Sequence, residues 1–260
     1  MRIVCLSAEA ADICARLGAW DDVVAVSAFA AQTGLAPRPV IGGFSRTDCG
    51  RVAELHPDLV ICFSDVQADI AAQLIRGGCT VLATNQRTLR EIAETIRLIG
   101  GAIGRTTAAK QLVKEFHQDL EALQNSTTPQ PRVYFEEWPD PPISAIGWVG
   151  ELIEHCGGMD LFAARRGRAS RERVVAPEEV IAADPDIIVA SWCGRRVDVG
   201  AIRARAGFSN LRAVQDGQIH TIHSDLLLQP GPRVLEGGRE LLHIFEAWRR
   251  ACIPTAPRSP

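Results

Sequence analysis

One short pattern occurs twice in this chain, about half its length apart. The first copy reads Val-Ala-Glu-Leu-His-Pro-Asp-Leu-Val-Ile-Cys-Phe from Val52, and the second reads Val-Ile-Ala-Ala-Asp-Pro-Asp-Ile-Ile-Val-Ala-Ser-Trp from Val180. Each copy combines the end of a helix, a Pro-Asp pair that stops it, an aliphatic strand and an aromatic residue. Because Pro57 and Pro185 are 128 residues apart in a chain of 260, the pattern predicts two similar lobes rather than a solenoid of short repeats.

The rest of the sequence alternates short aliphatic runs with helical patterns. Strands are expected at 3–6, 23–26, 59–63, 80–83, 133–136, 187–190 and 218–222. Helices are expected between them at 10–17, 48–55, 67–76, 149–156 and 176–183, with a last helix at 234–251. Continuous apolar strands separated by helices are typical of parallel sheets covered on both faces. We therefore predict an α/β fold with two Rossmann-like lobes and mainly parallel sheets.

A long helical stretch is predicted between the two lobes. Apolar residues recur at spacings of three and four on both sides of a turn expected at Gly100-Gly101. They are Leu89, Ile92, Ile96 and Ile99, then Leu112, Val113, Phe116, Leu120 and Leu123. We expect a long backbone helix that joins the lobes, although an outer helix covering a sheet explains the periodicity equally well. The predicted domains are an N-terminal lobe over 1–88, a helical backbone over 89–127 and a C-terminal lobe over 128–260.

Composition narrows the class of protein. With a net charge of -3 and a pI of about 6.1, and with no basic run, the chain lacks the electrostatic pattern of a nucleic-acid binder. No apolar stretch approaches the roughly 20 residues of a membrane-spanning helix. The eight cysteines contain no Cys-x-x-Cys pair, and Arg2 onward reads as a strand rather than a signal peptide. We expect a cytoplasmic protein, or a periplasmic one if the native start lies upstream.

Aromatic residues gather where the predicted strands end. Open α/β sheets bind ligands at the carboxyl ends of their strands, and these loops hold much of the chain's small set of aromatic side chains. They predict an apolar cleft between the lobes, with a polar rim, suited to a large planar ligand. For each aromatic, the alternative is that it fills the edge of its own lobe. The predicted ligand-binding residues are Phe29, Phe44, Phe63, Trp138, Ile143, Trp148, Trp192, Asp225 and Gln229.

Other candidate sites have simpler explanations. His220 and His223 would point to opposite faces of a strand, so we predict no metal site there. Glu136 and Glu137 would also diverge, and a solvated strand end explains them better than acid–base chemistry. The glycines near Gly104 match no phosphate-binding motif. We therefore predict a binding protein with no catalytic residues, no metal and no cofactor.

Several segments of the sequence resemble a known family. They are Arg2-Ile-Val-Cys-Leu-Ser with Leu17-Gly18-Ala19, Leu55-x-Pro57-Asp58-Leu-Val-Ile, Pro141-Pro142 before Glu151-Leu-Ile-Glu-x-Cys-Gly-Gly158, and Ser224-Asp225 with Pro230-Gly-Pro-Arg233. The chain is similar, from Arg2 to about Ala251, to cobalamin-binding proteins of the helical-backbone (class III) periplasmic binding protein family. These proteins deliver vitamin B12, iron-siderophores or haem to ABC importers.

The resemblance implies a ligand and a set of contacts. A cobalamin or related corrinoid would be held by aromatic positions that match Phe29, Phe44, Phe63 and Trp192, with Ile143 at a position where the family often has an aromatic residue. Asp225 and Gln229 match polar ligand contacts, with Gln in place of an arginine. The remaining alternatives are a haem or ferric-siderophore binder, and a tetrapyrrole enzyme such as a metal chelatase that would use Glu136, Glu137 and His223.

The resemblance also implies a partner, an ABC permease. The family docks through one acidic residue on each lobe. Here the first position falls on Gly50, with Glu54 one turn further on, and the second stretch offers Arg203 and Arg205. The permease therefore stays an open expectation, and an intracellular corrinoid carrier is the other role considered. We expect a monomer.

Overall fold

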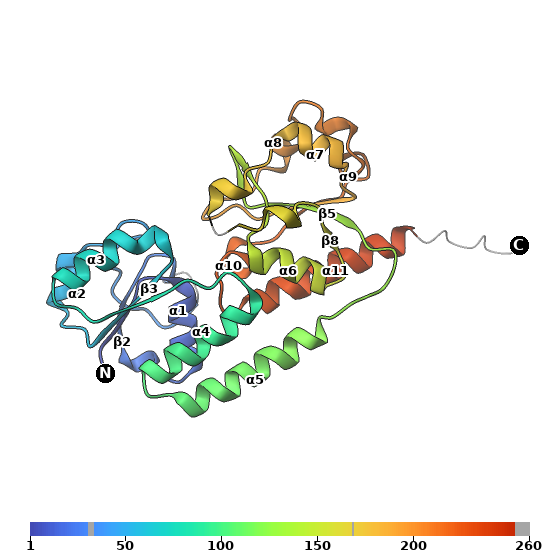
Figure 1. Cartoon of the computed structure of the whole chain (residues 1–260). Coiled ribbons are helices and arrows are strands. Elements are labelled where there is room, and N and C mark those ends of the chain that lie inside the picture. The colour runs from blue at the N-terminus through green and yellow to red at the C-terminus, as the bar shows by residue number, and fades with distance from the viewer. Residues whose placement is uncertain (31–33, 168, 253–260) are drawn as a thin grey trace, which may run out of the picture. The chain divides into compact units, whose positions relative to one another are not determined.

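The computed structural model describes residues 1–30, 34–167 and 169–252, and these residues form two compact units (Figure 1). Unit 1 comprises Met1–Gln118 and a short return segment, Gln229–Arg233. Unit 2 comprises Asp119–Leu228 and residues 234–252. Each unit has its own parallel sheet with helices on both faces, which confirms the predicted α/β class.

Unit 1 is built on a parallel sheet in the order β2-β1-β3-β4. Its strands are β1 (Ile3–Cys5), β2 (Val23–Val26), β3 (Leu59–Phe63) and β4 (Val81–Thr84). Helices α2 (Cys49–Glu54) and α3 (Ala68–Arg76) cover one face, where Val52 and Leu74 pack with Val60. Helices α1 (Ala8–Arg16) and α4 (Leu89–Ala102) pack together on the other face. Single 3-10 turns, η1 (Trp20–Asp22) and η3 (Asp65–Gln67), complete the unit.

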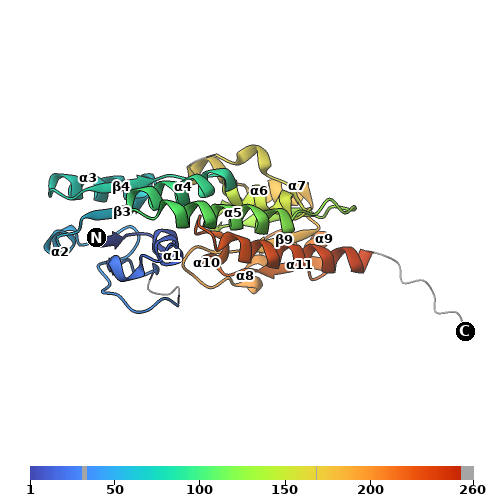
Figure 2. The same cartoon turned by 90° about the horizontal axis from the view of Figure 1, so that it is seen from below.

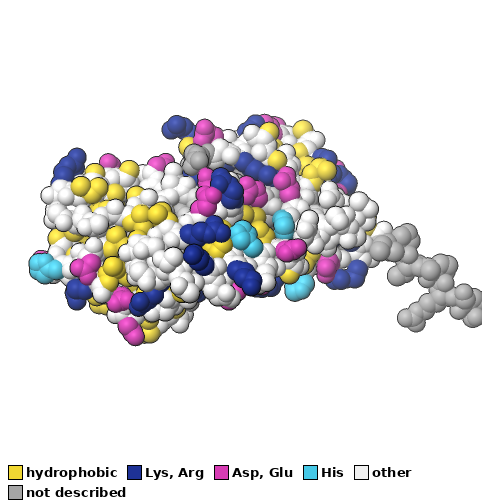
Figure 3. Space-filling view, turned by 60° about the horizontal axis from the view of Figure 1, so that its bottom comes forward, with side chains coloured by type: hydrophobic (Ala, Val, Ile, Leu, Met, Phe, Trp, Pro, Cys, Tyr) yellow, Lys and Arg dark blue, Asp and Glu magenta, His cyan; other side chains and the backbone are white. Residues whose placement is uncertain are grey.

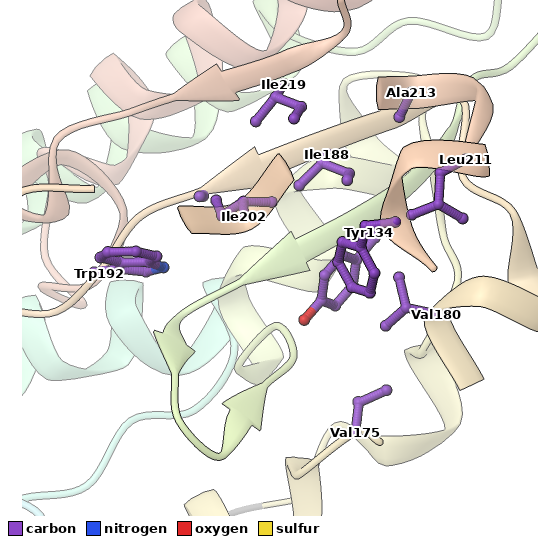
Figure 4. Packing of buried hydrophobic residues seen from close by; sticks show 11 residues of the cluster. Tyr134, Val175, Val180, Ile188, Trp192, Ile202, Leu211, Ala213 and Ile219 are labelled. Atoms are coloured by element: carbon purple, nitrogen blue, oxygen red, sulfur yellow. The ribbon is translucent and has the colours of Figure 1, made fainter. Parts of the chain in front are cut away.

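Unit 2 repeats this plan with a parallel sheet in the order β10-β9-β5-β8. Its strands are β5 (Arg132–Glu136), β8 (Met159–Asp160), β9 (Ile187–Ala190) and β10 (Ile219–Thr221). One face packs against α7 (Pro177–Ala183), α8 (Val199–Arg203) and α9 (Arg212–Gln215) through the apolar cluster drawn in Figure 4. The other face carries α6 (Gly147–His155) and α11 (Val234–Cys252), as Figure 1 shows.

Shorter elements of unit 2 were not predicted from the sequence. An antiparallel hairpin of β6 (Trp138–Pro139) and β7 (Pro142–Ile143) follows β5, and α10 (Ser224–Leu227) follows β10. Turns of 3-10 helix occur at η4 (Ala163–Arg165), η5 (Ser170–Arg173) and η6 (Phe208–Asn210). These pieces are too short for a periodic pattern to reveal them.

The repeated Pro-Asp pattern makes the same hydrogen bonds in both units. In unit 1, the Arg2 N–H donates to the Asp58 carboxylate at 2.7 Å, and in unit 2 the Arg132 N–H donates to the Asp186 carboxylate at 2.9 Å. The aspartate N–H groups return bonds to the carbonyls of the same arginines, at 2.8 and 2.9 Å. Each pair ties the first strand of its sheet to the start of the third strand.

Arg2 and Arg132 also donate hydrogen bonds to the carboxyl ends of the helices that precede Pro57 and Pro185. The Arg2 side chain donates to the Leu55 carbonyl at 2.9 Å, and the Arg132 side chain donates to the Ala183 carbonyl at 2.6 Å. Both carbonyls lie two residues before the proline, where the helix leaves acceptors unsatisfied. When the strands of each four-stranded sheet are numbered in chain order, both sheets have the order 2-1-3-4. The predicted duplication is therefore a structural repeat.

The helical stretch between the sheets consists of two helices. Helix α5 (Thr106–Ala122) follows α4 after a turn at Gly104, which has φ of 70°, whereas the predicted turn at Gly100-Gly101 lies inside α4. The two helices run side by side in both views of Figures 1 and 2. They approach so closely at Gly100 that a Cβ there would lie 2.3 Å from the Cβ of Ala109.

This packing changes the expected domain boundaries. We predicted a separate segment over 89–127, but contacts group α4 and most of α5 with unit 1, because the apolar side of α4, which includes Ile92 and Ile96, is fully buried and α4 packs against α1. No helix in the described ranges combines the length and apolar character needed to cross a membrane. On the face drawn in Figure 3, basic and acidic side chains are interspersed.

Candidate ligand-binding site

The carboxyl edge of the unit 1 sheet brings two predicted aromatic residues together. Phe63 ends β3 and Phe44 lies in the loop before α2, and their ring centroids are 6.3 Å apart with a tilt of 45°. Phe63 is buried, whereas Phe44 is half-buried. Phe29, in the loop after β2, is also half-buried. Phe44 and Phe63 thus form an apolar pair at this edge.

A buried glutamine, missed by the sequence analysis, positions this aromatic pair. The Gln67 side-chain amide donates to the carbonyls of Leu6, at 3.1 Å, and Phe44, at 2.7 Å. Its oxygen accepts the Phe63 N–H at 2.8 Å. Gln67 therefore links β1, the Phe44 loop and the end of β3. A fully buried amide with every role used is a structural group, and burial cannot be read from its position in the sequence.

Polar side chains also collect at this edge of unit 1. Ser7, Glu9, Ser27 and Gln86 are all buried, and each has a side-chain oxygen without a hydrogen-bond partner in the described part of the chain. Burial raises the pKa of Glu9 to about 7, with a contribution from Asp12, against a lowering effect of the Ser7 hydroxyl. The return segment packs onto this group, since a Cβ on Gly231 would lie 2.8 Å from that of Glu9.

In unit 2, the hairpin after β5 pairs Trp138 with Ile143. The two residues face each other across β6 and β7, and both are half-buried. The Trp138 indole N–H donates to the Asp140 carbonyl at 2.9 Å, so its hydrogen-bonding need is met within the hairpin. Pro139, Pro141 and Pro142 restrict the backbone around this pair. The hairpin thus presents an apolar surface at the end of the unit 2 sheet.

Two of the predicted contact residues are parts of the unit 2 core. Trp148 is 2% exposed, and its indole N–H donates to the Leu227 carbonyl at 2.7 Å. Trp192 is 3% exposed and belongs to the same apolar cluster as Tyr134. In Figure 4, Trp192 lies at the end of that cluster, just beyond β9. These positions favour the alternative interpretation, in which both tryptophans fill the edge of their own lobe.

The expectation of a solvated strand end at Glu136 and Glu137 was wrong. Glu136 is fully buried and accepts hydrogen bonds from the Tyr134 hydroxyl at 2.9 Å and the Trp192 indole N–H at 3.0 Å. Arg205 also donates to both of its carboxylate oxygens, at 2.9 Å for the Nη2 bond. A cation and two neutral donors compensate the cost of burying this carboxylate.

Glu137 diverges from Glu136, as predicted, and forms a separate ion pair. The buried Arg173 donates to its two carboxylate oxygens at 2.5 and 3.2 Å, and to the Ser144 carbonyl. Since both glutamates are committed to arginines, neither is placed as an acid or base for catalysis. Arg205, considered above for permease docking, is likewise committed to Glu136.

The two predicted polar contacts belong to different units. Asp225 lies in α10 of unit 2, and its carboxylate is 3.6 Å from Nδ1 of His223. Gln229 begins the return segment of unit 1.

Burial lowers the pKa of His220, whose ring nitrogen lies 2.9 Å from the Gln218 side-chain oxygen. The described residues contain no group of three histidine, cysteine or carboxylate ligands suited to a metal ion.

Arg195 is a further residue of this edge that the sequence analysis missed. It is exposed in the loop after β9, and its guanidinium carbon lies 5.3 Å from the centroid of the Trp138 ring and 5.5 Å from that of Trp192. Its position three residues after Trp192 was the available signal, but only the fold brings Trp138 to the same place.

Comparison with known proteins identifies the family. The model of the periplasmic binding protein family matches residues 3–226. The chain belongs to this family. An uncharacterized ABC transporter substrate-binding lipoprotein of Bacillus subtilis, YvrC, is 29% identical over 252 residues, which cover 92% of this chain and 78% of that protein. A cobalamin-binding protein of Halobacterium salinarum is 28% identical over 255 residues, which cover 94% and 69%.

Solved structures of periplasmic binding proteins share the fold. The haem-binding protein RhuT from Roseiflexus sp. RS-1 aligns with a TM-score of 0.81 at 23% identity, covering 97% of this chain and 99% of that one. The vitamin B12-binding protein BtuF of Vibrio cholerae aligns with a TM-score of 0.75 at 25% identity, covering 96% and 98%. The neighbours thus include binders of two different tetrapyrroles, and the fold does not select one of them.

Proposed function

We propose that this periplasmic binding protein binds cobalamin or a related corrinoid and delivers it to an ABC importer. The observation that carries the proposal is the apolar surface at the carboxyl edge of each sheet, made in unit 1 by Phe44 against the buried Phe63 and in unit 2 by Trp138 and Ile143. Relatives named for binding cobalamin or vitamin B12, and one named as an ABC transporter component, support both parts of the proposal.

The proposed function is reversible binding, in which the ligand is not changed chemically. A flat macrocycle gains free energy by burying its faces against rigid side chains, at about 25 cal/mol per Å² of apolar surface. Aromatic side chains on short loops lose little conformational entropy when a ligand binds. Asp225 and Gln229 would make hydrogen bonds to the amide side chains of the corrin, as the resemblance implied. These roles are proposals for the two residues.

The structure offers little support for haem or for an enzyme. Tyr134, the only tyrosine, is buried in β5 and donates to Glu136, so its oxygen is not placed to bind a haem iron. The carboxylates that a chelatase would use, Glu136 and Glu137, are held in ion pairs with arginines. A periplasmic location fits the family better than the cytoplasmic one expected from the start of the sequence.

A calorimetric titration tests the proposal. The purified protein is titrated separately with cyanocobalamin, cobinamide, haemin and a ferric siderophore. We expect saturable heat with at least one corrinoid and none with the other two ligands. Binding of haemin or the siderophore, with no heat from either corrinoid, would contradict the proposal. Cobalt insertion into a metal-free tetrapyrrole would instead favour the enzyme.

A further inference from the structure

Arg195 is held in an unusual position at the carboxyl edge of unit 2. Its guanidinium lies over the rings of both Trp138 and Trp192. The N–H groups of these indoles donate to the Asp140 carbonyl and the Glu136 carboxylate. Because indole N–H and guanidinium groups are both donors, each ring attracts the cation through its π system. Contacts of this kind attract a cation and restrict a long side chain that would otherwise be free in water. Arg195 is therefore an exposed cation with a restrained position.

The acidic groups around Arg195 already have other partners. Glu136 is paired with Arg205 and Glu137 with Arg173. Asp198 caps α8 by accepting the Ala201 N–H at 3.0 Å. Asp225 belongs to the same neighbourhood, since the charges of Glu137 and Asp225 both raise the pKa of Cys193, although burial is the larger cause.

The guanidinium of Arg195 keeps its hydrogen-bonding capacity. Across residues 1–30, 34–167 and 169–252, it makes neither a hydrogen bond nor an ion pair with another side chain. A guanidinium has N–H donors in a planar fork, which matches two oxygens of a phosphate or carboxylate. An oxyanion on the ligand is the group that this arrangement complements best.

We propose that Arg195 selects complete corrinoids by binding the phosphodiester of their nucleotide loop. This inference rests on the proposed function. In a complete cobamide, the amide side chains of the ring are neutral, and the phosphodiester is the negatively charged group outside the corrin macrocycle. Cobinamide has the same ring and amides but lacks this phosphate. The two ligands therefore separate contact with the corrin from contact with the phosphate.

The test compares both corrinoids on matched variants. Arg195→Gln removes the charge, Arg195→Lys keeps the charge without the fork, and Arg203→Gln on the exposed end of α8 is the control. Dissociation constants are measured by calorimetry at low salt and at about 0.5 M salt, where exposed charge pairs are strongly screened. Circular dichroism and thermal unfolding check that each variant keeps its fold.

We expect Arg195→Gln to weaken cyanocobalamin binding about tenfold, in the range of a partly exposed charge-assisted pair, and to leave cobinamide binding within about twofold. Added salt weakens cyanocobalamin binding to the wild type more than to this variant. Arg195→Lys lies between the two proteins, and Arg203→Gln matches the wild type.

Two further outcomes separate this inference from the proposed function. Equal loss for both corrinoids on Arg195→Gln, or no loss for either, would overturn the phosphate contact while corrinoid binding by the wild type stands. A wild type that binds neither corrinoid would overturn the proposed function itself, and this inference with it. The wild type alone therefore tests the proposed function, and the comparison with Arg195→Gln tests the phosphate contact.

Discussion

The two units share one strand order but differ at the carboxyl edges of their sheets, where ligands are expected. Both sheets have the same strand order, and both use an arginine and an aspartate to join the first and third strands. In unit 1, the chain passes from β1 directly into α1, with Ser7 at the N-cap position. In unit 2, the β6–β7 hairpin comes between β5 and α6. The repeated residues set the fold, whereas the residues suited to a particular ligand lie where the repeat is broken.

The two edges also handle buried polar groups differently. Unit 2 buries the Glu136 carboxylate and pairs it with the half-buried Arg205 guanidinium. Unit 1 buries the Glu9 carboxyl, and this burial, with a contribution from Asp12, raises the pKa of the group to about 7. The comparison predicts that removing a carboxylate destabilises unit 2 but stabilises unit 1 at high pH. The following predictions test this contrast in order of expected size.

The largest effect is expected for Glu136→Ala in unit 2. The change leaves the half-buried Arg205 without its counterion and removes the partner of Trp192 and Tyr134. Breaking a buried ion pair in this way costs about 3–5 kcal/mol in the free energy of unfolding. Urea unfolding measures the loss, with the exposed Glu178→Ala on α7 as the control. Equal stability of the two variants would show that the ion pair contributes little.

The second prediction concerns Glu9→Gln in unit 1. Because the folded pKa of Glu9 is about 7, above its ordinary 4.5, its favourable contribution is complete below pH 4.5 and is lost as the pH rises through about 7. Gln remains neutral. The variant should match the wild type near pH 4.5 and be more stable by up to about 3 kcal/mol at pH 8. Thermal or urea unfolding across this range measures the difference, and a pH-independent difference would contradict the prediction.

Two smaller effects test the hydrogen bonds that join the first and third strands in both units. Asp58→Ala and Asp186→Ala each remove a carboxylate that accepts the N–H of the first strand's arginine. We expect losses of about 1 kcal/mol for Asp58 and about 2 kcal/mol for Asp186. The second loss is larger because Asp186 is buried and also pairs with Arg212 at 2.7 Å, whereas Asp58 is exposed. A larger loss at Asp58 than at Asp186 would contradict this prediction.

The sequence predicted most of the longer helices and strands because hydrophobic periodicity and residues that end helices are local signals. The structure places β2, β3 and β9 at the predicted residues, and the Pro-Asp pattern marks the same junction in both units. The hairpin over Trp138–Ile143 was missed because its strands are two residues long. The turn between α4 and α5 was misplaced because Gly100 is required by close helix packing rather than by a turn.

The candidate site was less accessible to sequence reasoning, since burial and pairing are tertiary properties. Trp148 and Trp192 follow the expected pattern for a ligand-binding edge, yet hydrogen bonds and packing hold both within unit 2. Glu136 looked solvated because the residue that pairs with it, Arg205, is 69 positions away. Arg195 became notable only when the fold placed two tryptophan rings beside it.

The proposed function claims that the apolar carboxyl edge of each unit contributes to corrinoid binding, and one substitution in each unit tests this claim directly. Phe44→Ala in unit 1 and Trp138→Ala in unit 2 remove half-buried aromatic rings, and calorimetry measures the affinity of each variant for cyanocobalamin. We predict that each change weakens binding at least about tenfold, as expected for aromatic anchors, and that Met159→Ala, an exposed control, has no effect. Unchanged affinity in either aromatic variant would contradict the role proposed for the edge of that unit.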